Sequence, residues 1–347
     1  MTIKHITLAD VGNWRKLFGP CAVIWGGVLR FRHWLYDSRI LSSQPGKLPT
    51  IVIGNLALGG TGKTPHAEYI LRQLRVWCKP AFLSRGYGRT TRGFIMANQA
   101  AASAQIIGDE PMQVHMKFPD LDVAVCENRL RGLDFLKTVS NANIAVLDDA
   151  LQHRKLQGDL KILLTEYDRP FWTDRLFPVG SLRDVRSAYR RANVIIVTKC
   201  PDRLSKDEQE NIIKAIRPVR NQRVFFTRLE YGNPVQVSGK PMDINASSSV
   251  LGIAGLANTE KFEQYLKQSF SLAHFESFGD HHNFSRKELT GLWTKYGNFA
   301  QAIVTTEKDA ARLKSIRGLD DIPIFVIPVS IAFLSGEAAF VQLLRTT

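Results

Sequence analysis

A glycine-rich segment that ends in lysine and threonine carries the clearest chemistry in the sequence. It reads A-L-G-G-T-G-K-T over 57–64 and follows an apolar run at 51–56. Glycines let backbone N–H groups turn toward a phosphate, Lys63 can reach the outer phosphates, and the Thr64 hydroxyl can meet Mg²⁺. We therefore expect a nucleoside triphosphate here. The residues expected to bind it are Gly59, Gly60, Thr61, Gly62, Lys63 and Thr64.

One position departs from the common form of this loop. The spacing G-x-x-x-x-G-K-[ST] places glycine where this chain has Ala57. The alternative is a glycine-rich turn that binds nothing. The strand-like run before the loop and the helical spacing of apolar residues over 65–71 favour a phosphate-binding loop.

Paired acids follow a second apolar run. Asp148 and Asp149 come directly after the strand-like residues 144–147. Open α/β sheets bind their ligands beyond the carboxyl ends of strands. In phosphate-loop enzymes, an acid at the end of a neighbouring strand holds Mg²⁺ directly or through water. The two aspartates are therefore expected in the metal region.

Three further polar clusters lie where strands are expected to end. G-D-E-P at 108–111 contains adjacent acids and, taken alone, is typical of a solvent-exposed loop. S-R-G-Y-G-R at 84–89 would place arginines and a tyrosine at the working edge of the sheet. F-G-D-H-H-N-F at 278–284 contains two histidines, whose adjacent side chains diverge and have no cysteine nearby. A histidine paired with a carboxylate for proton transfer is the more sensible chemistry there.

Short apolar runs that alternate with helical stretches must position these residues. Such alternation predicts an α/β fold with a parallel sheet covered on both faces, of the P-loop NTPase type. The expected strands of this sheet are the apolar run that begins at 51 and the segments 81–84, 122–125, 144–147, 160–164 and 194–198.

The pattern changes near residues 223–240, where β-rich segments flank a turn signal. Further strands are expected at 250–254, 302–305 and 322–328. We expect a second, smaller α/β domain joined by a β-hairpin linker. The predicted parts are an N-terminal helix at 1–40, a P-loop domain at 41–222, a two-stranded linker at 223–243 and the second domain at 244–347.

Composition limits the number of domains, the cellular compartment and the class of partner. The chain has 347 residues, 44% of them hydrophobic, so it can bury a large core and make two domains. Its four cysteines are scattered without a C-x-x-C pair, which fits a reducing compartment and indicates no disulfide framework. The net charge of +14 indicates an anionic partner, either nucleic acid, acidic lipid or polyphosphate.

The N-terminal segment helps to distinguish among these anionic partners. Over 14–36 apolar residues recur at helical spacing, and residues 1–50 carry seven Lys/Arg against two acids, a net of +5. The apolar core at 17–29 is shorter than the roughly 20 residues that span a bilayer. The residues after it do not form a signal-peptide cleavage site. Two interpretations remain, namely a basic amphipathic helix lying on an anionic membrane, which we favour, and a helix packed on its own domain.

The order of these motifs resembles the tetraacyldisaccharide 4′-kinase family, the lipid A 4′-kinases of Gram-negative bacteria. The resemblance runs through most of the chain, and Ala57 is usual for that family. Its motifs are G-N-x-x-x-G-G-T-G-K-T-P at 54–65, S-R-G-Y-G at 84–88, G-D-E-P at 108–111, D-D-A-L-Q-H-R at 148–154, G-S-L-R-D at 180–184, G-I-A at 252–254, D-H at 280–281 and T-E-K-D-A at 306–310. Ala150 stands where glycine is typical, and Asp184 stands where glutamate is typical.

The resemblance implies transfer of the ATP γ-phosphoryl group, with Mg²⁺, to the 4′-hydroxyl of a tetraacylated glucosamine disaccharide 1-phosphate, giving lipid IVA. It implies Asp109 as the base supported by His281, with Lys63 stabilising the transferred charge. The metal region would hold Thr64, Glu110, Asp148 and Asp149, and the substrate contacts would come from Arg85, Tyr87, Arg129, Gln152 and Arg183. We expect a monomer at the cytoplasmic face of the inner membrane, with no nucleic-acid partner.

Two other classes remain to be distinguished. A guanine-nucleotide switch or metallochaperone-type GTPase is suggested by T-K-C-P-D at 198–202, which matches the guanine-reading motif N-K-x-D poorly. A nucleic-acid motor is suggested by the positive charge, but the chain has no second motor core and no recognition helix or RNP-type aromatic pattern.

Overall fold

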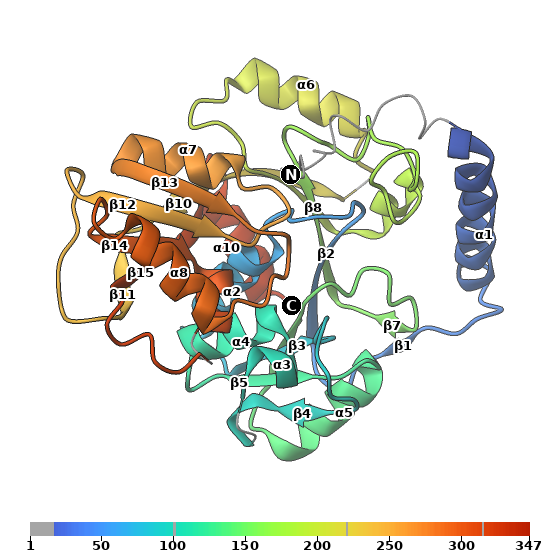
Figure 1. Cartoon of the computed structure of the whole chain (residues 1–347). Coiled ribbons are helices and arrows are strands. Elements are labelled where there is room, and N and C mark those ends of the chain that lie inside the picture. The colour runs from blue at the N-terminus through green and yellow to red at the C-terminus, as the bar shows by residue number, and fades with distance from the viewer. Residues whose placement is uncertain (1–16, 100–101, 220, 314–315) are drawn as a thin grey trace.

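The computed structural model describes residues 17–99, 102–219, 221–313 and 316–347. Within these residues, nine strands form the first sheet, in the spatial order β16, β10, β9, β8, β2, β6, β3, β5, β4 (Figure 1). All neighbours from β10 to β5 run parallel, and the edge strands β4 and β16 run antiparallel. The bounds are β2 (Thr50–Asn55), β3 (Pro80–Ser84), β4 (Ile95–Met96), β5 (Asp122–Val125), β6 (Ile144–Leu147), β8 (Leu160–Glu166), β9 (Val194–Thr198), β10 (Arg223–Tyr231) and β16 (Val329–Phe333).

Apolar cores lie on both faces of this sheet. Every residue of β2, β3, β6 and β9 is buried, as expected for parallel strands covered by helices on both sides. One core joins Ile51 and Ile53 to α2, α4 and α10, and the other joins Val52 to α5 and α6. The predicted P-loop-type parallel sheet is therefore confirmed. Its helices are α2 (Lys63–Leu74), α3 (Ala104–Ile107), α4 (Asp109–Lys117), α5 (Arg129–Val139), α6 (Lys206–Ile216) and α10 (Glu337–Arg345), with the 3₁₀ turns η2 (Ala97–Gln99) and η3 (Arg186–Arg191).

A second sheet of five strands has the order β11, β15, β14, β12, β13. It is parallel except for β11, and α7, α8 and α9 accompany it. The bounds are β11 (Val235–Ser238), β12 (Ser249–Ala254), β13 (Ser271–Ser277), β14 (Ala302–Thr306), β15 (Ile324–Ile327), α7 (Glu260–Ser269), α8 (Arg286–Tyr296) and α9 (Glu307–Leu313). A second α/β unit therefore exists, and the strands predicted at 250–254 and 302–305 belong to it.

The predicted hairpin linker at 223–243 is wrong in its pairing. β10 adds to the first sheet beside β9, whereas β11 adds to the second sheet beside β15. β10 carries buried Phe225 and Phe226, which pack in the first core, so burial outweighs the turn signal that follows. The end of the predicted second domain also returns to the first sheet, because β16 pairs with β10 and α10 packs on α2.

The N-terminal helix α1 (Gly19–Asp37) lies at the side of the molecule opposite the second sheet (Figure 1). Its inner face buries Ala22, Gly26, Leu29, His33 and Tyr36. Nearby, β1 (Gln44–Pro45) and β7 (Leu156–Gln157) form a short parallel pair. No described helix is long and apolar enough to cross a membrane. The part of the predicted N-terminal segment before residue 17 lies outside the described residues.

A buried ion-pair cluster fixes α1 to the domain. His33 Nε2 lies 2.6 Å from Asp184 Oδ1, and Arg191 Nη2 donates to Asp184 Oδ2 at 2.8 Å. Burial alone would raise the pKa of Asp184, but the His33 contact and the charge of Arg191 hold it below its usual range. The shorter acid at 184 therefore keeps its charge and uses it to hold the helix.

Candidate active site

The glycine-rich loop joins the end of β2 to the start of α2. Gly59 and Gly62 have φ of 109° and 84°, a region where a Cβ is strained. Two hydrogen bonds stabilise the loop. Asn55 Nδ2 donates to Thr61 Oγ1 at 2.9 Å, and Lys199 Nζ donates to the Gly60 carbonyl at 2.5 Å. Lys63 and Thr64 open the helix. The N-terminus of this twelve-residue helix, with its free N–H groups, suits an anion.

The paired acids follow β6, the strand next to β2. Asp149 has φ of 48°, and its Oδ1 lies 3.9 Å from Lys63 Nζ. Arg183 donates to both carboxylate oxygens of Asp149, the Nη1 contact with Oδ2 measuring 2.7 Å. Burial would raise the pKa of Asp149, but the Arg183 hydrogen bond and the Lys63 charge lower it. Asp149 therefore stays ionised between two cations.

The pKa of Asp148 is shifted in the opposite direction. It is 5% exposed, and its Oδ1 has no hydrogen-bond partner among the described residues. Burial, then the charge of Asp149, raises the pKa of Asp148 to about 7. Arg129 lies behind it and donates Nη2 to the Asp148 carbonyl at 3.3 Å. A buried carboxylate oxygen without a donor is a place where a cation could bind.

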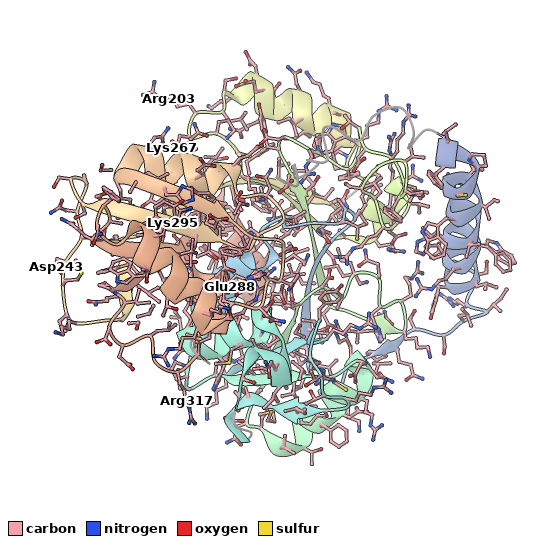
Figure 2. All side chains as sticks on the ribbon, in the orientation of Figure 1. Arg203, Asp243, Lys267, Glu288, Lys295 and Arg317 are labelled. Carbon is pink, nitrogen blue, oxygen red and sulfur yellow. The ribbon has the colours of Figure 1, made fainter. Side chains whose placement is uncertain are left out.

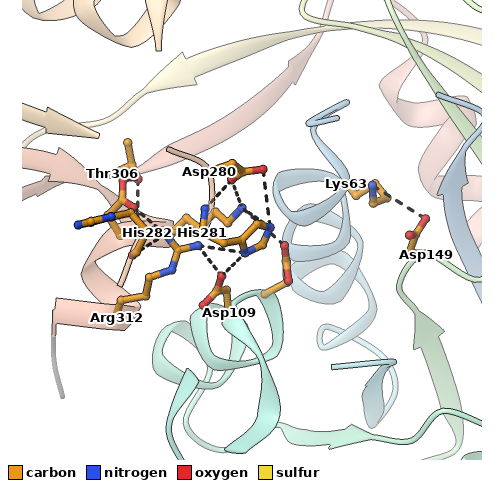
Figure 3. Close-up of polar contacts among 11 residues, drawn as sticks. Lys63, Asp109, Asp149, Asp280, His281, His282, Thr306 and Arg312 are labelled. Carbon is orange, nitrogen blue, oxygen red and sulfur yellow. Dashed lines mark hydrogen bonds and ion pairs between the residues drawn. The ribbon is translucent and has the colours of Figure 1, made fainter. Parts of the chain in front are cut away.

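His281, which follows a strand of the second sheet, contacts Asp109 beside the first sheet. Asp109, the first residue of α4, accepts Arg312 Nη2, and its Oδ2 lies 2.7 Å from His281 Nδ1 (Figure 3). His281 has φ of 59°, an uncommon backbone for a non-glycine residue. Burial would raise the pKa of Asp109, but the hydrogen bonds from His281 and Arg312 hold it below its usual range. Asp109 is thus a carboxylate at neutral pH.

Further contacts stabilise the place where the second sheet meets the start of α4. Arg312 Nη1 donates to Asp309 Oδ1 at 3.1 Å, and Asp309 also accepts Thr306 Oγ1 at 2.7 Å. Lys308 Nζ lies 3.0 Å from Asp280 Oδ1 and 4.0 Å from Glu110 Oε1. α9 of the second sheet therefore carries the cations that meet the acids at the start of α4.

Two glycines bring the predicted motifs together. A Cβ on Gly86 would lie 2.7 Å from the Ile107 carbonyl, and one on Gly108 would lie 3.0 Å from the Tyr87 carbonyl. The turn at 84–89 consequently packs directly on G-D-E-P. This places the Tyr87 ring 5.6 Å from the His281 ring. The exposed loop expected for G-D-E-P alone is wrong, because Asp109 is only 8% exposed.

The remaining predicted substrate residues surround the acid pair in different ways. Gln152 donates Nε2 to the Asn55 carbonyl at 2.9 Å, and Arg183 donates to Asn55 Oδ1 as well as to Asp149. Arg129 is buried, and its two terminal nitrogens donate to backbone carbonyls. Arg85 is exposed. Direct substrate contact stays a prediction for all of them.

Sequence reasoning missed Arg312, Lys308 and Lys199. Lys308 lies inside the quoted motif T-E-K-D-A but received no role, and Arg312 follows that motif by two residues. The helical spacing of Asp309 and Arg312 is the local signal that could have suggested an ion pair. Lys199 was considered as part of a guanine-reading motif. Its ammonium instead contacts Gly60 and Glu166, which makes it a support of the phosphate loop.

Comparisons with known proteins identify one family. The model of the family described as tetraacyldisaccharide-1-P 4′-kinase matches residues 14–347. A tetraacyldisaccharide 4′-kinase of Flavobacterium johnsoniae is 39% identical, covering 94% of this chain and 95% of that protein. One of Bacteroides thetaiotaomicron is 37% identical, covering 93% and 90%.

A solved structure gives the same result at the level of the fold. The crystal structure of LpxK from Aquifex aeolicus in complex with ATP aligns with a TM-score of 0.76 at 25% identity. It covers 96% of this chain and 99% of that chain. The family match spans nearly the whole chain, the relatives are more than 30% identical at almost full coverage, and the chain therefore belongs to the tetraacyldisaccharide-1-P 4′-kinase family.

Proposed function

We propose that this protein transfers the γ-phosphoryl group of ATP to the 4′-hydroxyl of a tetraacyldisaccharide 1-phosphate, giving lipid IVA. The observation that supports this most is the meeting of Asp109 and His281, 2.7 Å apart, from two different sheets beside a phosphate-binding loop. A switch that only binds nucleotide has no need of a carboxylate–histidine pair, whereas transfer to a hydroxyl must remove a proton.

Asp109 would accept the proton of the sugar hydroxyl. Its low pKa makes it a weak base, yet phosphoryl transfer passes through a loose transition state that depends mainly on positioning and charge. A carboxylate held ionised by Arg312 and oriented by His281 meets that requirement. His281 supports the pair from the second sheet, so the two sheets must stay together for the pair to exist.

Lys63 and the backbone N–H groups of 60–64 would bind the phosphates and stabilise the charge that grows on the γ-oxygens. Thr64 and Asp148 fit a Mg²⁺ ion, because the Asp148 oxygen has no donor and burial disfavours its charge. Asp149 and Glu110 lie close enough to influence Asp148 electrostatically. When bound, Mg²⁺ would neutralise phosphate charge.

The described residues contain no cluster of three or more His, Cys, Asp or Glu side chains that could hold a metal. This fits a nucleotide-bound Mg²⁺, which takes one or two protein ligands and obtains the others from phosphates and water. ATP and Mg²⁺ should therefore bind together.

We further propose that α1 lies on the anionic membrane that holds the substrate. Ile24, Trp25, Val28 and Phe31 of the apolar stripe predicted from the sequence point outward, each 46–69% exposed, and Trp34 beside them is 53% exposed. Side chains of α1 project from the outer side of the molecule in Figure 2. An exposed apolar surface of this kind is typical of a membrane contact. We propose that this membrane is the inner membrane of a Gram-negative cell, at its cytoplasmic face, with the protein a monomer.

Incubation with γ-labelled ATP, Mg²⁺ and the lipid disaccharide 1-phosphate, followed by lipid separation, tests the reaction. Wild-type protein should label the lipid, and Asp109→Ala should lower kcat by about 10²–10⁴-fold while ATP binding is retained. Label that stays in free phosphate, or a strict preference for GTP, would instead favour a nucleotide switch.

A further inference from the structure

Three consecutive carbonyl groups of the glycine-rich loop, at residues 60–62, each accept a hydrogen bond from a side chain. Lys199 Nζ donates to the first at 2.5 Å, Thr198 Oγ1 donates to the second at 3.0 Å, and His66 Nδ1 lies 2.7 Å from the third. Thr198 is the last residue of β9, Lys199 follows it, and His66 stands in the first turn of α2. These three bonds fix the carbonyl side of the loop backbone.

The His66 ring is held at both of its nitrogens. It is 1% exposed, and its Nε2 lies 3.0 Å from Oγ1 of Thr227 on β10. A carbonyl oxygen can only accept, so Nδ1 must carry the hydrogen that points to Gly62. Burial lowers the pKa of His66 to about 4, so the ring is neutral near pH 7 and Nε2 accepts the Thr227 hydroxyl. The ring is therefore a fixed donor to the loop.

The direction of each carbonyl sets the direction of the next N–H group. A trans peptide is planar, so the C=O of one residue and the N–H of the next point to opposite sides. Holding the Gly62 carbonyl therefore directs the Lys63 N–H, and holding the Thr61 carbonyl directs the Gly62 N–H. Gly62 has φ of 84°, and a glycine here leaves the neighbouring peptides free to rotate. The backbone N–H of His66 also reaches the Gly62 carbonyl, at 3.2 Å, and the shorter contact from Nδ1 restricts that rotation further.

The N–H groups on the other side of the loop are left for an anion. Gly62 is the N-cap of α2, and no side chain among the described residues caps the helix there. The first N–H groups of an α-helix have no partner within the helix. The carbonyls of the loop are thus occupied by side-chain donors, whereas N–H groups at the start of the helix remain available to phosphate oxygens.

We propose that His66 and Thr198 are positioning residues of this loop. Together with Lys199 they hold its carbonyls so that the N–H groups of Gly62 and Lys63 face the phosphates of ATP. The proposal rests on the proposed function for the identity of that ligand. Both side chains act through the loop backbone and not by touching the phosphates. A loop that is ordered before ATP binds loses less conformational freedom on binding, so removal of one donor should weaken ATP binding.

Substitutions of His66 separate the roles of its two nitrogens. His66→Gln places an amide nitrogen near the position of Nε2 and removes the donor to Gly62. It should raise the Kd for ATP with Mg²⁺, measured by calorimetry, about 3- to 10-fold, the range of one neutral hydrogen bond. His66→Asn places an amide nitrogen near the position of Nδ1, so its Kd should stay within about twofold of wild type. Both variants lose buried contacts, and urea unfolding should show a lower stability for both.

Thr198→Val tests the neighbouring carbonyl with a side chain of nearly the same shape. It should raise the Kd for ATP about 3- to 10-fold, and Thr198→Ser, which keeps the hydroxyl, should restore most of the affinity. Thr305→Val is the matched control. Thr305 is a fully buried threonine of β14 in the second sheet, and its hydroxyl has no hydrogen-bond partner among the described residues. This variant should bind ATP as wild type does.

The outcomes distinguish the positioning role from the proposed function. If wild-type protein binds ATP but labels no lipid, the proposed function fails, and the Kd values still test the loop. If His66→Gln and His66→Asn bind ATP equally well, or lose affinity only in proportion to their lost stability, His66 has a structural role alone and its positioning role is overturned. If neither His66 variant folds, Thr198→Val decides, and a wild-type Kd in that variant would overturn the proposal.

Discussion

Replacing Asp148 by asparagine should stabilise the nucleotide-free protein while it abolishes phosphoryl transfer. The wild-type carboxyl is buried beside Asp149, and its pKa is raised from 3.8 to about 7. Below about pH 4 the carboxyl is protonated in both the folded and the unfolded chain. Between about pH 4 and pH 7 the unfolded chain releases this proton and the folded chain keeps it, so stability falls as the pH rises. Above about pH 7 both forms are ionised and the full cost persists.

The size of the effect follows from the shift. About 3 pKa units at 1.36 kcal/mol per unit give a cost of about 4 kcal/mol above pH 7. Asparagine removes the charge but leaves a buried amide without a full set of partners, which costs about 1–3 kcal/mol. We therefore expect a net gain of about 1–3 kcal/mol in the free energy of unfolding at about pH 8, and no gain at about pH 4.

Urea unfolding of both proteins in EDTA, at about pH 4 and about pH 8, measures this difference. Because Glu68 is not among the groups coupled to Asp148 and titrates in both proteins, its contribution cancels in the comparison. Mg²⁺ and ATP should then stabilise wild-type protein more than the variant, since the cation neutralises only a carboxylate. A variant that is less stable than wild type at about pH 8, with the same pH dependence, would refute the reasoning that burial disfavours this charge.

Three other predictions concern the Arg312 ion pairs between the two sheets, the N-terminal helix α1 and the glycine-rich loop. Arg312→Met should lower the free energy of unfolding by about 3–5 kcal/mol, because it leaves buried Asp309 and Asp109 without their cation. In the same variant the depressed pKa of Asp109 should rise, so acid unfolding should begin at a higher pH, as circular dichroism would record. Replacing Trp25 and Trp34 together by serine should weaken flotation with anionic vesicles severalfold and change stability by less than about 0.5 kcal/mol, because both rings are exposed. Lys199→Met should raise the Kd for ATP measured by calorimetry, since the Gly60 carbonyl loses its support, and an unchanged Kd would contradict that role.

Local patterns were sufficient for the loop and for the parallel strands β2, β3, β5, β6, β8 and β9, but β13 and β16 were not predicted. Continuous apolar runs such as 194–198 and 144–147 became strands with those bounds, because both faces of a parallel sheet are buried and the sequence shows no alternation. The glycine spacing before Lys63 likewise predicted a strand–loop–helix that the structure contains. The motif order was sufficient to identify the family.

Long-range pairing was not predictable in the same way. The segment 223–243 has the composition of a hairpin, yet its two strands join different sheets, because partner choice depends on which sheet edge is free. Nothing local to Arg312 indicates that it reaches Asp109, 203 residues away.

The return of β16 and α10 to the first sheet affects the order in which the two sheets can fold while the chain is being synthesised. The first sheet lacks its outer strand and one covering helix until residues 329–347 have been synthesised, although its central strands are made early. The second sheet is complete by residue 327 and can form first, as parts of large proteins commonly do during translation. Until then Phe225 lacks the rings of Phe333 and Phe340 that cover it. A ribosome that pauses before residue 329 would therefore hold a nascent chain whose nucleotide-binding sheet is incomplete. The apolar surface around Phe225 would then be exposed, and chaperones could bind it.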